Sequence, residues 1–174
     1  MKNLLLLILL VTSCATNPDV IVDYDREADF SAYHTFDLAP LASEVQYDYP
    51  QYDNSLNRKR IIKAVESQLT GKGYEKDTIS PDLLVDIHIL IQSKKEVRSY
   101  PGAARYRYWQ DYNINIYDYE EGSLIIDLID RSQNQLVWQG GVTGSINIKP
   151  EEVESAISGA VALIFGEYPY RANK

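Results

Sequence analysis

Strict alternation of side-chain character between Leu83 and Gln92 limits the folds open to this chain. Every second residue from Leu83 to Ile91 is aliphatic, whereas the residues between them include Asp86 and His88. A period of two places the aliphatic side chains on one face of a β-strand. A strand whose second face is mixed fits an antiparallel sheet that packs a core on one side and is partly hydrated on the other. The sequence therefore predicts such a sheet.

Further strands are indicated on both sides of this segment. Residues 124–129 alternate in the same way, and the polar residues 131–134 separate them from a second apolar stretch that begins at Leu136. This pattern predicts a hairpin, with its second arm running on to Ile148. Residues 20–24 and 33–38 are rich in β-branched and aromatic side chains, which predicts two earlier strands.

Two segments have the period of an amphipathic helix. The first is predicted to begin at a cap, Asp53 or Asn54, and to end at Gly71-Lys72-Gly73. Its expected apolar positions are Leu56, Ile61, Ile62, Val65 and Leu69, with Arg58 among the residues on its other faces. The second is predicted to begin at Pro150, and its expected apolar positions are Val153, Ile157, Ala160, Val161 and Ile164.

One apolar stripe per helix and a short strand expected near Tyr74 complete the pattern. Together these elements predict an α+β fold, a two-layer sandwich in which a mostly antiparallel sheet is covered on one face by two amphipathic helices. Residues 20–170 form its single domain. The chain has 25 acidic and 17 basic residues, a net charge of −8, and this acidic balance argues against a nucleic-acid partner.

The N-terminus has the pattern of a bacterial lipoprotein signal. Lys2 precedes an apolar run, Leu4 to Val11, that is too short to span a bilayer and leads to Cys14, the single cysteine of the chain. A plain secretory signal and an uncleaved membrane helix are the alternatives. We expect residues 1–13 to be a signal peptide, Cys14 to carry a lipid that anchors the protein to the membrane, and residues 14–19 to be a short tether. Ala15 favours, by analogy, the outer membrane facing the periplasm.

Four sequence stretches occur in an order that resembles a known family. They are VDYDREADFSAYHTF from Val22, LTGKGYE from Leu69, PDLLVDIHI from Pro81 and GSLIIDLIDRSQNQLVWQG from Gly122. The chain resembles the bacterial lipoproteins that contain the domain of unknown function 4136. The resemblance implies a cell-envelope lipoprotein with one α+β domain, and it implies no activity, cofactor or catalytic residue.

The segment from Lys94 to Tyr119 differs in composition from the rest of the chain because basic and aromatic residues alternate in it. Such side chains are enriched where proteins bind partners, so the segment is a candidate surface for an envelope protein or a glycan. The candidate residues are Arg98, Tyr100, Arg105, Tyr106, Arg107, Tyr108, Trp109 and Tyr112. The alternative is a long β-hairpin whose tyrosines pair across its strands and whose charges keep its edges soluble.

No motif in the sequence specifies catalysis. Asp86 and His88 share a strand face, but a zinc site needs at least one further ligand, so we predict no metal and no cofactor. Two carboxylate pairs, Asp127 with Asp130 and Glu120 with Glu121, are the candidates for hydrolase chemistry. In the simpler interpretation Asp130 shapes a hairpin turn.

These observations favour a non-catalytic binding or scaffolding lipoprotein. An envelope hydrolase that uses an Asp/Glu pair with His88 is one alternative. Passive self-association through the second sheet face is another, and the apolar residues expected there are Leu84, Leu90, Ile125 and Ile129.

Overall fold

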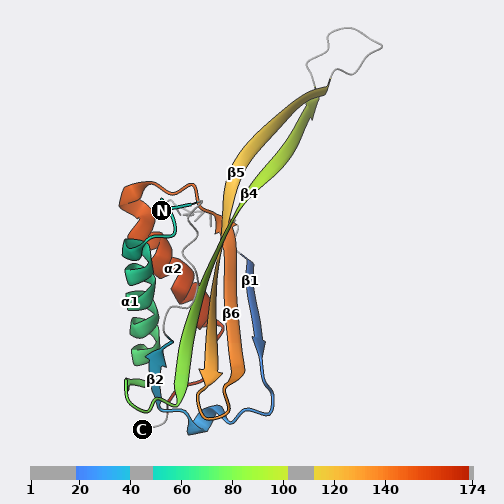
Figure 1. The fold of residues 1–174 in the computed structure, drawn as a ribbon. Helices are drawn as coiled ribbons and strands as arrows, with labels where there is room; N and C mark the ends of the chain where they lie inside the picture. The colour runs from blue at the N-terminus through green and yellow to red at the C-terminus, as the bar shows by residue number, and fades with distance from the viewer. Residues whose placement is uncertain (1–18, 40–48, 102–111, 173–174) are drawn as a thin grey trace, which may run out of the picture.

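The computed structural model describes residues 19–39, 49–101 and 112–172 (Figure 1). The strands are β1 (Asp19–Tyr24), β2 (Thr35–Leu38), β3 (Glu75–Lys76), β4 (Leu83–Pro101), β5 (Tyr112–Asp130) and β6 (Gln135–Ser145). The helices are α1 (Ser55–Gly71) and α2 (Val153–Gly166), and the 3-10 turns are η1 (Phe30–Ala32) and η2 (Pro150–Glu152).

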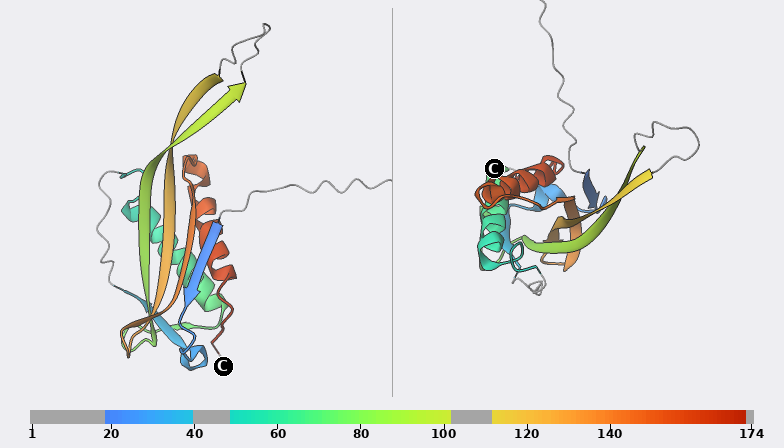
Figure 2. Two further views of the ribbon diagram at one scale, coloured as in Figure 1. Left: turned by 90° about the vertical axis from the view of Figure 1, so that its right-hand side faces the viewer. Right: turned by 90° about the horizontal axis from the view of Figure 1, so that it is seen from above.

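The strands form one six-stranded sheet in the order β1-β6-β5-β4-β2-β3. All neighbours are antiparallel except β2, which runs parallel to both β3 and β4. Both helices cover the same face of the sheet and pack against each other (Figure 2). The predicted α+β sandwich is confirmed, and we call the uncovered side of the sheet the open face.

The core lies between the sheet and the two helices. Trp138 of β6 is 1% exposed, and its ring centroid lies 5.9 Å from that of Phe165 and 5.1 Å from that of Tyr168. A Cβ at Gly140 would lie 2.3 Å from the Trp138 indole and 2.7 Å from Ile164 of α2. Glycine at this position therefore allows the indole to lie flat between the strand and α2.

Four sequence predictions need correction. The second strand begins at Thr35, because Asp29 caps η1 and holds the preceding residues in a turn. Strand β6 ends at Ser145, well before Ile148, because the chain turns away from the sheet through a hydrogen bond from Ile148 N to Ile146 O.

The other two corrections concern the faces of α1. Leu56 was expected in the apolar stripe and is 66% exposed, whereas Arg58 was expected on a solvent face and is buried. The stripe that enters the core consists of Ile61, Val65 and Leu69. Leu56 lies outside the stripe because it comes nine residues before Val65, which places it on the opposite side of α1. Arg58, three residues before Ile61, lies on the side of the stripe, and its buried charge is paired with Asp53. The predicted Asn54 cap and the Gly71-Lys72-Gly73 end are confirmed.

The β4–β5 hairpin continues beyond the body of the molecule as a two-stranded arm (Figure 1). Its strands pair from Ser93 and Glu120 out to Pro101 and Tyr112, past the last β6 partner of β5, Glu121. Strand rise gives this arm a length of about 30 Å. The long-hairpin alternative for the basic and aromatic segment is thus confirmed for the backbone that the structure describes.

Acid should destabilise this fold through Asp82, which ties β2 to the start of β4. Its carboxylate accepts hydrogen bonds from His34 N at 2.8 Å, Thr35 N at 2.9 Å and Thr35 Oγ1 at 3.0 Å. Burial raises the pKa of Asp82, but these hydrogen bonds outweigh it and the pKa lies below its ordinary value. A depressed pKa contributes stability above the unfolded-state pKa, and that stability is lost as the pH falls through the folded-state pKa.

We therefore expect Asp82→Asn to lower the unfolding free energy at pH 7 by about 1–3 kcal/mol. In this variant the unfolding free energy should also decrease less steeply below about pH 4 than in the wild type. Urea denaturation at a series of pH values measures both effects. Asp19→Asn, at an exposed residue of edge strand β1, is the matched control and should change neither. An acid dependence in Asp82→Asn as steep as in the wild type would contradict this assignment.

Candidate functional site

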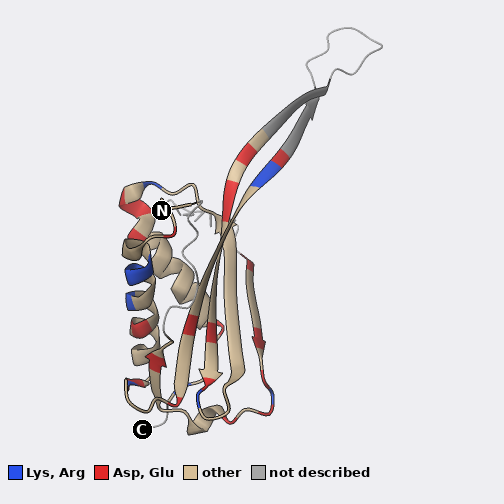
Figure 3. Ribbon diagram, viewed as in Figure 1, with Lys and Arg blue, Asp and Glu red and all other residues tan. Residues whose placement is uncertain are grey.

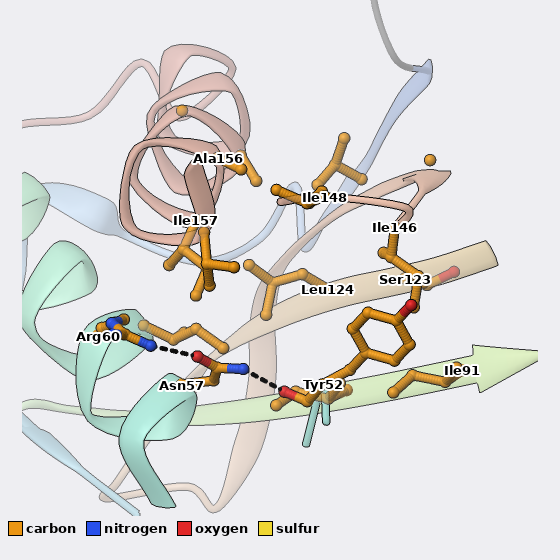
Figure 4. Close-up of a pocket in the computed structure, with 18 of the residues that line it drawn as sticks. Tyr52, Asn57, Arg60, Ile91, Ser123, Leu124, Ile146, Ile148, Ala156 and Ile157 are labelled. Carbon is orange, nitrogen blue, oxygen red and sulfur yellow. Dashed lines mark hydrogen bonds between the residues drawn. The ribbon is translucent and has the colours of Figure 1, made fainter. Parts of the chain in front are cut away.

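A deep apolar groove of about 730 Å³ lies between α1, α2 and the helix-covered face of the sheet (Figure 4). Aliphatic side chains from three sides form it: Leu124 from the sheet, Ile157 from α2, and Ile146 and Ile148 from the segment that joins β6 to η2. The exposed residues Leu56 and Leu163 lie at its edge. The groove is thus open to solvent while its walls are largely apolar.

Small residues keep the groove from being filled. Helix α2 lines it with Ala156, Gly159 and Ala160, which add little or no side-chain volume. On the sheet side, a Cβ at Gly122 would lie 2.6 Å from Cγ2 of Ile146, so glycine is what permits the connecting segment to form this wall. The groove is several times larger than the roughly 150 Å³ apolar cavity that accommodates a benzene molecule.

The α1 side of the groove is polar. The Asn57 amide Nδ2 donates to Tyr52 O at 2.8 Å, and Arg60 Nη1 donates to Asn57 Oδ1 at 2.6 Å (Figure 4). The Tyr52 phenol donates a hydrogen bond to Glu120 at the base of the arm, and this bond raises the pKa of Tyr52. The groove therefore combines apolar walls with one cationic side chain, Arg60.

A buried ion pair fixes the loop that carries Tyr52. Arg58 Nε lies 2.5 Å from Asp53 Oδ1, and Arg58 Nη2 lies 2.8 Å from Asp53 Oδ2. The hydrogen bond with Asp53 raises the pKa of Arg58, against the effect of burial. Asn54 then caps α1 by accepting from Leu56 N and Asn57 N, so the loop and the helix start form one rigid wall.

The residues proposed from sequence as a partner surface lie away from this groove or outside the described residues. Arg98, Tyr100 and Tyr112 are in the strands of the arm, where the structure describes their backbone alone. Outside the described residues are Cys14, Arg105, Tyr106, Arg107, Tyr108 and Trp109. The groove was not predicted from the sequence. Two of its features, Leu56 of α1 and the small residues of α2, can nevertheless be read from the sequence.

The hydrolase candidates are only partly brought together. On the open face, His88 Nε2 lies 3.3 Å from Asp127 Oδ2 and 3.6 Å from Asp86 Oδ2, and none of the three lines the groove. Within the described ranges, no three His, Cys, Asp or Glu side chains are arranged to hold a metal ion.

Asp130 has the structural role expected of it. It points to the other face of β5 from Asp127, where its Oδ1 accepts from Ser132 N at 2.7 Å and from Gln133 N at 3.0 Å. Burial raises the pKa of Asp130, but the hydrogen bonds from Ser132 and its neighbours outweigh it, so the pKa is lowered. Asp127 and Asp130 cannot work as a pair across a cleft, and the hairpin-turn interpretation of Asp130 is confirmed.

The open face bears the apolar residues expected for self-association. Leu90 is exposed, whereas Leu84, Ile125 and Ile129 are half-buried by neighbouring side chains. Ile21 of edge strand β1 adds a further exposed side chain to this face. The polar cluster around His88 interrupts the patch.

Fold and groove together define a two-layer α+β domain with an apolar groove between its helices and its sheet. The chain belongs to the DUF4136 family, a domain of unknown function, which matches residues 20–170. No curated protein matches the chain significantly. In the described part of the chain, neither helix is long and apolar enough to cross a membrane.

Solved structures share the fold at low sequence identity. A PDZ domain protein from Parabacteroides distasonis has a TM-score of 0.56 and 15% identity over 90% of this chain, and the match spans 36% of that protein. The PelC dodecamer from Paraburkholderia phytofirmans has a TM-score of 0.52 and 10% identity, over 90% of this chain and 100% of PelC. A PelC variant from the same organism gives 0.50 and 11%, over 91% and 100%. These similarities concern the fold alone.

Proposed function

We propose that this chain is a lipid-anchored, non-catalytic binding protein of the bacterial cell envelope whose groove holds an acyl chain of a membrane lipid. The observation that carries the proposal is the groove of about 730 Å³, with its aliphatic walls and small α2 residues. Ligand pockets of several hundred Å³ with mostly apolar linings suit molecules of this size. Each methylene group buried there contributes about 0.8 kcal/mol.

The anchor supports a lipid ligand because it would keep the groove near a membrane. Five residues separate Cys14 from Val20, a span that reaches less than about 20 Å even when fully extended. Asp19 at the start of β1 pairs with Thr143, which lines the groove. A lipid attached at Cys14 would therefore place the groove within reach of bilayer acyl chains, in the outer membrane facing the periplasm according to Ala15.

The arm supports a second candidate function, the binding of an envelope protein or a glycan. An isolated two-stranded hairpin is at best marginally stable in water. The arm extends beyond the helices (Figure 1), and among the described residues no third strand pairs with it. A partner that packs on the arm would supply the missing contacts. The basic and aromatic residues expected at its tip suit such a partner.

Filling the groove should abolish lipid binding. We expect Ala156→Trp to weaken the binding of a fluorescent palmitate analogue at least tenfold, because the indole would occupy volume that the acyl chain needs. Tenfold corresponds to about 1.4 kcal/mol, or the lost burial of about two methylene groups. A fluorescence titration of the Cys14→Ser chain, which cannot be lipidated at that site, measures the affinity without detergent.

Ala162→Trp is the matched control, since Ala162 is an exposed residue of the same helix that does not line the groove. Its affinity should equal that of the parent chain. Circular dichroism and thermal melting establish that both variants are folded. Equal affinities in the two folded variants, or no saturable binding to the parent chain, would refute the proposed function.

A further inference from the structure

Arg60 is half-buried and, unlike the buried Arg58 of the same helix, has no acidic partner among the described residues. Arg58 is paired with Asp53, whereas the hydrogen bond of Arg60 goes to the neutral amide oxygen of Asn57. Among the described residues, no carboxylate forms an ion pair with Arg60. This half-buried cation lines an apolar groove and still has donors to offer.

The orientation of Arg60 is fixed from the loop side. Asn57 is buried, and its Nδ2 donates to Tyr52 O at 2.8 Å, which turns its Oδ1 toward Arg60. One guanidinium nitrogen is used in this contact, and the others are left for a ligand. Figure 4 shows Arg60 and Asn57 on the α1 side of the groove, across from Ile146 and Ile148.

The charged side chains next to Arg60 in the sequence of α1 are also positive. Basic residues of α1 gather in its N-terminal half (Figure 3), where Lys59 and Lys63 are exposed. The acidic chain thus presents a local cationic region next to an apolar groove. An amphiphile with an apolar tail and an anionic head complements this arrangement.

We propose that Arg60 binds the anionic head of the acyl ligand, so that the groove selects lipids that carry a carboxylate or phosphate group. The inference rests on the proposed function and names the ligand class. A guanidinium suits both groups because its planar fork can donate two parallel hydrogen bonds to their oxygens. The aliphatic walls would then hold the tail in the direction of Ile146 and Ile148.

The test compares palmitate, 1-palmitoyl lysophosphatidate and the uncharged hexadecanol as competitors of the fluorescent analogue on the Cys14→Ser chain. We expect Arg60→Gln to weaken the two anionic ligands by roughly tenfold or more, the loss expected for a charged hydrogen bond, and to leave hexadecanol unchanged. Arg60→Lys should restore part of the loss. Lys63→Gln, which removes an exposed cation from the same helix, should leave the affinities for all three ligands nearly unchanged.

The outcomes separate this inference from the proposed function. Tight binding of all three ligands that Arg60→Gln does not alter would overturn the headgroup inference and leave the groove function intact. Failure of every ligand to bind would refute the groove function itself. Weaker binding of the anionic ligands to Arg60→Gln, with hexadecanol unchanged, supports the inference, and the anionic ligand that the parent chain binds more tightly identifies a carboxylate or a phosphate as the preferred head.

A further arm of the experiment tests whether the protein's own lipid occupies the groove. The lipidated chain in nanodiscs is compared with the Cys14→Ser chain. If palmitate enters the groove of the Cys14→Ser chain and not that of the lipidated chain, the occupant is the lipid on Cys14, and the inference of a separate anionic lipid is overturned. Equal palmitate affinity in the two chains supports it.

Discussion

Replacing Asp53 with alanine should lower the unfolding free energy by about 3–5 kcal/mol, because the substitution removes the buried carboxylate that pairs with the buried guanidinium of Arg58. The Asp53 residue is 1% exposed, and the Arg58 side chain is 9% exposed. Water therefore cannot replace the missing carboxylate. The pair also holds the loop that carries Tyr52, so the same substitution should disorder one wall of the groove and weaken palmitate binding.

Urea denaturation of the purified chain measures this loss. Glu66→Ala is the matched control, because it removes one partner of an ion pair with Lys76 whose N–O distance is 2.6 Å and whose side chains are 32% and 44% exposed. Exposed pairs contribute about 0–1 kcal/mol. Equal losses in the two variants would mean that the Asp53–Arg58 pair is not buried in solution, and the account of the groove wall would be wrong.

Substitution of Cys14 by serine should remove all covalently attached lipid from the protein. The chain has a single cysteine, and a thiol forms a thiolate far more readily than a hydroxyl ionises, so serine is a poor substitute as a nucleophile. We expect the wild-type chain to incorporate a clickable palmitate analogue in growing cells and the Cys14→Ser chain to incorporate none. In-gel fluorescence after affinity purification provides the measurement.

Ser13→Ala serves as the control because it keeps a small residue before the cysteine and should leave labelling unchanged. Mass spectrometry of the wild-type N-terminal peptide gives an independent readout, and its expected first residue is a lipid-modified Cys14. Label that persists in Cys14→Ser, or a mature chain that begins at another residue without lipid, would exclude the anchor and the membrane proximity on which the lipid ligand is argued.

The elements of the fold were predictable because their signals are local. The aliphatic residues from Leu83 to Ile91 do face the core, since a period of two admits one arrangement on a strand. Asn54 caps α1 as its side chain predicts. The strand order could not be predicted from the sequence, because the parallel contact of β2 with β4 depends on how the whole chain packs.

The groove could not be predicted for a related reason. Leu56 lies nine residues before Val65, which at 3.6 residues per turn is the opposite face of α1, so its place in the core stripe was wrongly assigned, and the period does not say what borders that opposite face. The burial of the Arg58 charge depends on a tertiary feature, the loop before α1 that brings Asp53 to its guanidinium. From the sequence, Arg58 was expected to be a solvated charge. Its partner, Asp53, precedes the helix and belongs to no periodic pattern.

The sequence also drew attention to the part of the chain with the most unusual composition. Lys94 to Tyr119 forms the arm as far as it is described, and a role for its tip in partner binding remains a proposal. The groove residues, such as Ala156 and Leu124, are ordinary in composition. They form the groove because the fold brings separate segments of the chain together, and this arrangement cannot be read from the composition.

The most direct test of the central claim is a methyl NMR titration of the Cys14→Ser chain with palmitate. The account predicts chemical-shift changes that saturate at the groove residues Leu124, Ile146 and Ile157, while Ile21 and Ile129 of the open face keep their positions. Changes confined to the open face, or changes that never saturate, would contradict the claim that the groove between α1 and α2 is a lipid-binding site.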